Sequence, residues 1–295
     1  RLSRDRSRVR VPSLPPKNFM SDFKKEYIDL FKNILLGTHY QESSWERLYN
    51  NHKRLISWPI SMQFFRDLII KIFQNRSIIL FKEKKHDPQK AIEGKGTSGP
   101  RYTAVSKKRL DNIEFCINEI LKNQIEGDFI ETGVWRGGSC IFMRELLRIN
   151  NVTDRKVYVA DSFEGMPIPK DNNDGPDHSL FDSAKVSLEQ VKSNFKTFNL
   201  DDEQVLFVKG WFSESLPKAN IGKLSLLRLD GDLYHSTMDS LNNLYKKVSK
   251  GGFVIIDDYN DWPECKRAVT DFRNNLAITS EIKNIDWTGI YWKVE

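Results

Sequence analysis

The sequence predicts an α/β fold built on a mostly parallel β-sheet with helices on both faces. Five short runs rich in Val, Ile, Leu and Phe follow residue 126, and patterns with helical spacing separate most of them. Strands that are apolar almost throughout are buried on both faces, which is typical of parallel strands joined by helices. The final run, IKNIDWTGIYWKV (282–294), predicts an antiparallel pair that closes one edge of the sheet.

The order of strands and helices predicts where a ligand would bind. The predicted strands cover residues 127–133, 156–162, 204–210, 224–232 and 251–259. The predicted helices cover residues 138–149, 186–198, 236–248 and 264–277, with Ser236 as the expected N-cap of the third. Ligands of such sheets bind beyond the carboxyl ends of the strands. Acidic residues close four of the five strands, so we expect them to converge along one edge of the sheet.

The first hundred residues have a different composition. Five of the first ten residues are arginine, so residues 1–25 are expected to form a basic, disordered head. Residues 26–100 are expected to form a helical appendage and linker, with helical spacing in EYIDLFKNIL (26–35) and SMQFFRDLIIKIF (61–73). The charged, Gly-rich stretch at 82–100 is interpreted as the linker or a mobile loop, and the sheet domain is expected to cover 101–295.

Composition excludes several classes of protein. The chain has 295 residues, of which 39% are hydrophobic and 29% charged, as expected for a soluble globular protein. Part of the net charge of +6 lies in the head, so the basic balance is a weak argument for a nucleic-acid partner. A solvated tail is favoured over a nucleic-acid arm or a contact with a membrane surface. The spacing of Cys116, Cys140 and Cys265 predicts neither a disulfide framework nor a zinc site. No apolar run approaches the ~20 residues that span a bilayer and no secretory leader is recognisable, so we expect a cytoplasmic protein without a transmembrane segment.

The first two strands end in patterns that suit a nucleotide-like ligand. ETGVWRGGSC (131–140) places three glycines between a strand and a helix, where the backbone can approach a phosphate or carboxylate closely or can simply form a tight turn. It matches neither G-x-G-x-x-G nor a P-loop. VADSFEGMP (159–167) ends its strand at Asp161, a position from which an acid commonly binds the hydroxyls of a ribose. Alternatively, Asp161 and Ser162 cap the following turn.

These motifs, together with GWFSESLP, LDGDLYHST, FVIIDDY and IDWTGIYW, resemble the macrocin O-methyltransferase family. The likeness is collinear from about Glu26 to the C-terminus, although Ala104 stands where the family usually has Met and residues 50–100 resemble nothing we can place. It implies a Rossmann-like class I methyltransferase sheet of order 3-2-1-4-5-7-6 over residues 101–295, S-adenosylmethionine as cofactor and a bound divalent cation. It also leans toward a homo-oligomer. The cofactor-binding positions it implies are Thr103, Glu131, Thr132, Gly133, Val134, Trp135, Asp161, Ser162, Gly210, Trp211 and Asp230. Trp211 would frame the adenine, or else be a core aromatic.

Two strands end in paired acids, LRLDGDLY (227–234) and FVIIDDY (253–259). Asp230, Asp257 and Asp258 offer the oxygen ligands that Mg²⁺ prefers, and three carboxylates without a cation would repel each other. Asp258 alone could be a helix cap. Asp232, expected on the same strand and face as Asp230, is the predicted general base, and the resemblance assigns it that role. His235 is the rival base, because its ordinary pKa suits proton transfer.

The sequence therefore predicts a Mg²⁺-dependent O-methyltransferase acting on a hydroxyl of a small molecule or glycan. A sugar of a glycosylated natural product or a polysaccharide precursor is the acceptor that the resemblance suggests. Residues 171–183 are interpreted as a loop that covers the substrate, with His178 as a contact, or as a loop without a function. The alternatives are a nucleotide-dependent oxidoreductase on a similar sheet and a non-catalytic binding module with a vestigial pocket.

Overall fold

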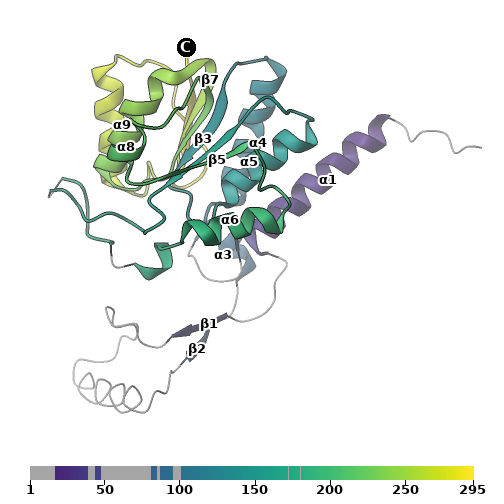
Figure 1. Ribbon diagram of the computed structural model, residues 1–295, viewed down its shortest axis with the longest axis horizontal. Helices are drawn as coiled ribbons and strands as arrows, with labels where there is room; N and C mark the ends of the chain where they lie inside the picture. Colours follow the sequence, from purple (N-terminus) through teal and green to yellow (C-terminus); the bar gives the residue numbers. More distant parts are fainter. Residues whose placement is uncertain are drawn as a thin grey trace, which may run out of the picture.

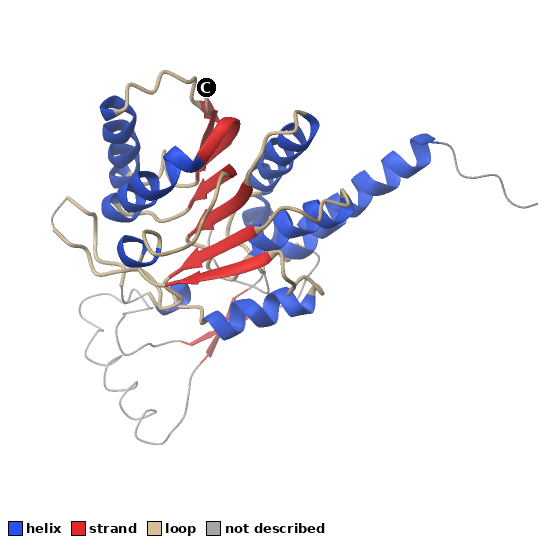
Figure 2. Cartoon of the chain, turned by 45° about the horizontal axis from the view of Figure 1, so that its top comes forward, coloured by secondary structure: helices blue, strands red, loops and turns tan. Residues whose placement is uncertain are grey.

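A seven-stranded sheet with helices on both faces organises the computed structural model, which describes residues 17–38, 44–47, 81–84, 87–95, 101–171, 173–179 and 181–295 (Figures 1 and 2). The strands are β3 (Asp128–Thr132), β4 (Val157–Asp161), β5 (Val205–Lys209), β6 (Leu224–Leu229), β7 (Val248–Ile256), β8 (Lys283–Asn284) and β9 (Ile290–Lys293). Their order is β5-β4-β3-β6-β7-β9-β8, which is the predicted order 3-2-1-4-5-7-6. The first five are parallel, and β9 pairs antiparallel with β7 and β8, as predicted.

Helices cover the sheet on both faces (Figure 1). The described helices are α1 (Lys17–Leu36), α3 (Pro88–Ile92), α4 (Lys107–Lys122), α5 (Gly138–Ile149), α6 (Leu188–Thr197), α7 (Phe212–Ser215), α8 (Tyr234–Leu244) and α9 (Pro263–Asn275). Two 3-10 turns (Asp182–Ala184, Tyr245–Lys247) and the antiparallel pair β1 (Ser44–Arg47) and β2 (Phe81–Lys84) complete the elements of the described residues. None of the described helices is long and apolar enough to cross a membrane.

Alternation along the strands divides the interior into two cores. In β3, Phe129 faces the core that contains α1, α4, α5 and α6, whereas its neighbour Ile130 faces the core that contains α8 and α9. Successive side chains of a strand point to opposite faces, so an apolar strand supplies both cores at once. Both faces of the sheet are therefore packed against an apolar core, and this packing holds the carboxyl ends of its strands in place.

Helix α1 packs on the sheet domain and is longer than predicted. It begins at Lys17, inside the predicted head, and its N-terminal end projects from the body of the molecule (Figure 1). Near its C-terminal end, the ring of Phe31 stacks on Phe142 of α5. The buried ammonium of Lys32 pairs with Asp111 and Glu114 of α4 at 2.6 and 2.5 Å. These contacts join α1 to the core of the sheet domain, while the domain boundaries drawn from the sequence stay a prediction.

The predicted linker contains a short helix. Asp87 caps α3 by accepting hydrogen bonds from the N–H groups of Gln89 and Lys90, and Pro88 occupies the first turn, where its missing N–H costs nothing. The linker interpretation of 82–100 was therefore incomplete, because this local capping signal outweighed the charge and Gly content of the stretch. The helical pattern at 61–73 lies outside the described residues.

Candidate active site

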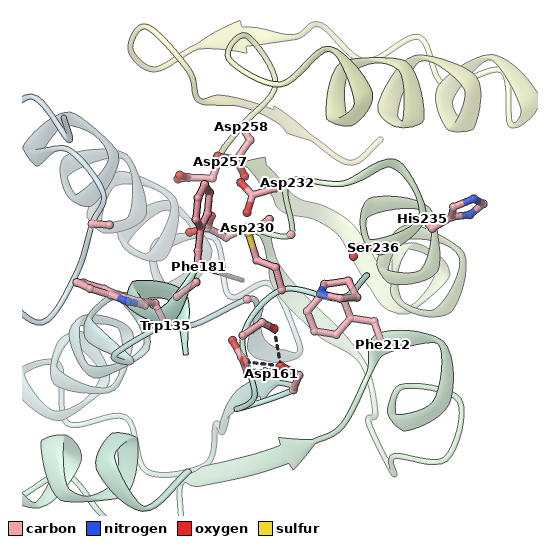
Figure 3. Close-up of a pocket in the computed structure, with 18 of the residues that line it drawn as sticks. Trp135, Asp161, Phe181, Phe212, Asp230, Asp232, His235, Ser236, Asp257 and Asp258 are labelled. Carbon is pink, nitrogen blue, oxygen red and sulfur yellow. Dashed lines mark hydrogen bonds between the residues drawn. The ribbon is translucent and has the colours of Figure 1, made fainter. Parts of the chain in front are cut away.

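A cavity of about 650 Å³ opens at the carboxyl ends of β3, β4, β6 and β7. Asp161 lies at one end, and Asp230, Asp232, Asp257 and Asp258 lie at the other (Figure 3). The convergence of acids predicted from the sequence is thus present in the structure. We describe the Asp161 end first and the acid cluster second, meaning by acid cluster these four aspartates.

Asp161 ends β4 and organises the turn around it. Its carboxylate accepts hydrogen bonds from the N–H groups of Val134 at 2.8 Å and Phe163 at 2.7 Å. The hydroxyl of Ser162 accepts from Glu164 N–H at 3.0 Å and donates to the Gly165 carbonyl at 2.8 Å. Burial raises the pKa of Asp161, and the N–H donors oppose the rise. The turn-capping interpretation is therefore correct, yet both side chains also line the cavity, so capping does not exclude ligand binding.

The glycine turn after β3 brings two strand ends together. Gly133 has φ +87°, and a Cβ there would lie 1.8 Å from the Asp230 carbonyl oxygen, so only glycine fits. Gly133 and Trp135 line the cavity, and the indole of Trp135 donates to the Ser183 carbonyl at 2.7 Å.

Several predicted cofactor positions lie outside the lining of this cavity. Thr132 is buried, and its hydroxyl has no hydrogen-bond partner among the described residues. Val134 is buried, and Thr103 packs beside Ser139, with 3.3 Å between their hydroxyls. Gly210 lies outside the lining, but the neighbouring Trp211 lines the cavity and is not a core aromatic. Their roles toward a cofactor stay predictions.

The acid cluster contains a candidate metal centre. Carboxylate oxygens of Asp230, Asp257 and Asp258 lie within 4.8 Å of one another. One oxygen of Asp258, Oδ2, is buried without a hydrogen-bond partner among the described residues. Buried polar atoms are rarely left unpaired, and a hard divalent cation would satisfy this one. The donor set therefore fits Mg²⁺.

Electrostatics of the acid cluster favour the same conclusion. Burial raises the pKa of Asp230 to about 6, with Asp257 adding to the rise. Burial and the charge of Asp230 raise the pKa of Asp232 to about 7. Burial and the other three carboxylates raise the pKa of Asp258 well above its ordinary value. Burial is the largest cause of each shift and repulsion between the carboxylates adds to it, and a bound cation would oppose both effects by stabilising the ionised groups.

Two guanidinium groups partly neutralise the cluster, and the sequence interpretation had missed both. Arg228 of β6 bonds to Glu131, Asp230 and Asp257, and Arg109 of α4 bonds to Asp257 and, at 3.1 Å, to Asp286. The available signals were an arginine inside the apolar strand LSLLRL and another in a helix facing it. Glu131 therefore points to Arg228 rather than into the cavity, and burial raises its pKa to about 7 although Arg228 opposes the rise.

Asp232 reaches the cluster by a different route from the one predicted. Strand β6 ends at Leu229, and Asp232 follows in a turn with φ +56°. Gly231 and the end of strand pairing let the chain turn, so the argument from strand alternation was wrong even though Asp232 lies beside Asp230 and Asp258 (Figure 3). The His235 ring points away from the cluster, and its Nε2 lies 3.3 Å from Asp171.

Helix α8 begins two residues before its predicted cap. Its first residue is Tyr234, so Ser236 lies inside the first turn and does not cap it. The carboxylate of Asp174 accepts a hydrogen bond from His235 N–H at 2.8 Å, and the Asp174 carbonyl accepts one from Tyr234 N–H at 3.2 Å. Asp174, which is distant in the sequence, therefore caps the helix instead of Ser236. It accepts hydrogen bonds from the N–H groups that a local cap would have paired.

The loop at 171–183 contributes one wall of the cavity. Phe181 lines the cavity, and His178, which does not, stacks on Phe181 and meets Trp262 edge-on. Ile168, 73% exposed, and Trp287, 46% exposed, are further apolar groups of the lining. The Trp287 indole donates to the Glu93 carbonyl at 2.9 Å, which fixes its ring at the rim. These groups are apolar parts of the lining of the same cavity.

Comparisons with known proteins agree with the fold and identify a family. The macrocin-O-methyltransferase (TylF) family matches residues 24–294. The chain is 42% identical over 242 residues to demethyldecarbamoylnovobiocin O-methyltransferase of Streptomyces niveus, covering 78% of this chain and 92% of that protein. It is 43% identical over 199 residues to mycinamicin III 3''-O-methyltransferase of Micromonospora griseorubida, covering 65% and 78%.

A second Streptomyces enzyme and a solved structure extend this likeness. The chain is 43% identical over 242 residues to 8-demethyl-8-(2,3-dimethoxy-alpha-L-rhamnosyl)-tetracenomycin-C 4'-O-methyltransferase of Streptomyces olivaceus, covering 78% and 92%. The solved structure of the O-methyltransferase NovP superposes with a TM-score of 0.74 at 37% identity, covering 92% of this chain and 98% of that one.

Proposed function

Because the chain belongs to the macrocin O-methyltransferase family, we propose that it transfers a methyl group from S-adenosylmethionine to a sugar hydroxyl in a Mg²⁺-dependent reaction. The observation that carries the proposal is the arrangement of one cavity, with Asp161 at one end and the acid cluster at the other. Asp161 would bind the ribose of the cofactor, and Asp230, Asp257 and Asp258 would hold the cation. The cofactor would supply the methyl group, and the cation the charge that makes an acceptor hydroxyl more acidic.

Asp232 is the proposed general base. It lies beside two of the proposed metal ligands and lines the cavity, whereas the ring of His235 points away from them (Figure 3). In the proposed step, Asp232 would take the hydroxyl proton as the acceptor oxygen receives the methyl group, and S-adenosylhomocysteine would be the other product. Position within reach of the reacting proton is the first requirement for a base, and Asp232 meets it better than His235.

The lining of the cavity supports an uncharged acceptor. Asp239 and Asp261 add carboxylates to the lining, and Lys170, which pairs with Asp239 at 3.3 Å, adds one ammonium group. A polyanion would meet repulsion here, in agreement with the expectation that nucleic acid is not a substrate. The apolar groups Met166, Ile168 and Trp287 suit the carbon skeleton of a glycosylated small molecule. One relative carries a rhamnosyl group in the name of its substrate, which supports a sugar as the methylated unit.

The test combines binding and turnover. S-adenosylhomocysteine should bind in calorimetry, and glycosylated small molecules should be screened for acceptor-dependent release of S-adenosylhomocysteine from S-adenosylmethionine. We expect turnover to stop with EDTA and in Asp230→Ala. Absence of cofactor binding, or turnover that survives both treatments, would contradict the proposal. Binding of NAD in place of S-adenosylhomocysteine would favour the oxidoreductase alternative, which the family assignment does not support.

A further inference from the structure

One buried guanidinium joins three strand ends beneath the cavity. Arg228 is fully buried, and its Nη1 donates to Asp230 at 2.9 Å and to Glu131, while its Nη2 donates to Asp257. Glu131 belongs to β3, Asp230 follows β6 and Asp257 follows β7, which are neighbouring strands. A single side chain therefore bonds to carboxylates from three strands.

The position of Arg228 is costly unless these contacts offset it. Every residue of β6 is buried, and the other five are leucine or serine. Moving an ion from water into such surroundings costs several kcal/mol unless it is paired with good geometry. Burial alone would lower the pKa of Arg228, but Asp257, Glu131 and Asp230 raise it above its ordinary value, so the group stays charged. The three carboxylates are thus its counter-charge.

The planar fork of the guanidinium also fixes the direction of its partners. Arginine presents donors in a rigid arrangement, so two carboxylates bound to it are held at a set separation and angle. Arg228 contacts Oδ2 of Asp230 and Oδ1 of Asp257, while Arg109 contacts Oδ2 of Asp257. Among the described residues, Arg228 reaches Oδ2 of Asp230 and not Oδ1, and each oxygen of Asp257 keeps a second lone pair, so both carboxylates can accept another ligand.

We propose that Arg228 is a positioning residue for the divalent cation, which holds Asp230 and Asp257 in the arrangement that receives it and anchors them to Glu131. The inference rests on the cation site of the proposed function. A positioning role and a role through charge alone have opposite effects on cation binding when Arg228 is removed. A positive group so near two ligands repels a cation, so removing it would tighten binding if Arg228 acted only through its charge. If Arg228 positions the ligands, its removal weakens binding.

The test measures binding of Mn²⁺ to the full chain by electron paramagnetic resonance and calorimetry, without substrate. Arg228→Gln removes the charge, and Arg228→Lys keeps the charge but not the fork. We expect affinity for Mn²⁺ to fall by about 10- to 100-fold in Arg228→Gln, the range measured when the partners of metal ligands are replaced, and by about tenfold in Arg228→Lys. Where Arg228→Gln does not fold, Arg228→Lys decides the question by the same measurement.

Arg144 supplies the matched control. It is also a buried arginine, and it binds Asp202 through two hydrogen bonds of 3.0 and 2.6 Å, away from the cavity lining. Arg144→Gln should lower thermal stability but leave Mn²⁺ affinity within about twofold, because no ligand moves. Equal or tighter Mn²⁺ binding by the Arg228 variants would overturn the inference alone. A wild-type protein that binds no Mn²⁺ would contradict the cation site of the proposed function and the inference with it.

Discussion

The carboxylate of Asp174 caps helix α8 through a 2.8 Å hydrogen bond from the N–H of His235, which lies 61 residues further along the chain. Asp174 is buried, and its second carboxylate oxygen accepts from Lys170 N–H at 2.9 Å. Helix α8 directly follows the turn that carries Asp230 and Asp232. The contact therefore joins the loop at 171–183 to the element that positions the proposed base.

Replacing this cap should destabilise the protein. Asp174→Ala leaves N–H groups of α8 and of the loop without partners, so we expect the free energy of unfolding to fall by about 2 kcal/mol. Urea unfolding followed by circular dichroism measures it. Asp174→Asn keeps one of the two accepting oxygens, so it should lose less stability than Asp174→Ala. Equal losses in the two variants would show that the carboxylate charge, rather than capping, stabilises the helix.

Removal of Asp161 should weaken cofactor binding. A hydrogen bond from a ribose hydroxyl to a carboxylate contributes roughly 1.5–3 kcal/mol, so the loss of even one in Asp161→Ala should raise the Kd for S-adenosylhomocysteine by at least about tenfold. Asp202 is the control, because its carboxylate also accepts a backbone N–H, that of Gln204 at 3.1 Å, outside the cavity lining. Asp202→Ala should lower stability without changing this Kd. An unchanged Kd in Asp161→Ala would place the ribose elsewhere.

Asp232 and His235 are distinguished by their conservative variants. Asn tolerates the left-handed backbone that Asp232 adopts, so Asp232→Asn should fold normally. We expect its kcat to fall by about 10²–10⁴-fold, the usual contribution of a general base, while Mn²⁺ affinity changes little. His235→Gln should keep kcat within about threefold. The reverse pattern of rate losses would move the base role to His235.

Without a divalent cation, stability should fall as the pH rises. The folded protein holds protons on Asp230 and Asp232 up to about pH 6 and 7, whereas these groups ionise near 3.8 otherwise. Between pH 3.8 and these raised pKa values, the folded protein binds more protons than the unfolded chain. The stability that this proton binding contributes is complete below about pH 4 and is lost as the pH rises through the folded pKa values. Melting temperatures in EDTA should drop from about pH 5 to 8. Mg²⁺ should raise them most at the upper end, and a flat profile would count against the raised pKa values.

Local patterns in the sequence were enough to predict the sheet and its site-forming ends. Apolar runs marked the five parallel strands, and helix α5 (Gly138–Ile149) has the predicted bounds because glycines mark its start and apolar spacing its length. The strand order came from the resemblance, because periodicity does not say which strands pair. The acids at the strand ends converge since parallel strands share a carboxyl edge.

What the sequence missed depends on contacts between distant residues. Asp174 caps α8 from another loop, and Trp287 is fixed by the Glu93 carbonyl, which lies far away in the chain. Arg228 lies in an apolar strand, and its partners Glu131 and Asp257 come from other strands. Such partners come together only in the folded protein, so no local sequence pattern predicts them. Helix caps and ion pairs between distant elements are therefore the features that are hardest to predict from a single sequence.

A crystal structure with S-adenosylhomocysteine and Mg²⁺ tests the central claim most directly. The account predicts the ribose hydroxyls on the carboxylate of Asp161 and the ion on Asp230, Asp257 and Asp258, with Asp232 facing the space left for an acceptor. A ribose bound away from Asp161, or an ion bound outside the acid cluster, would contradict it.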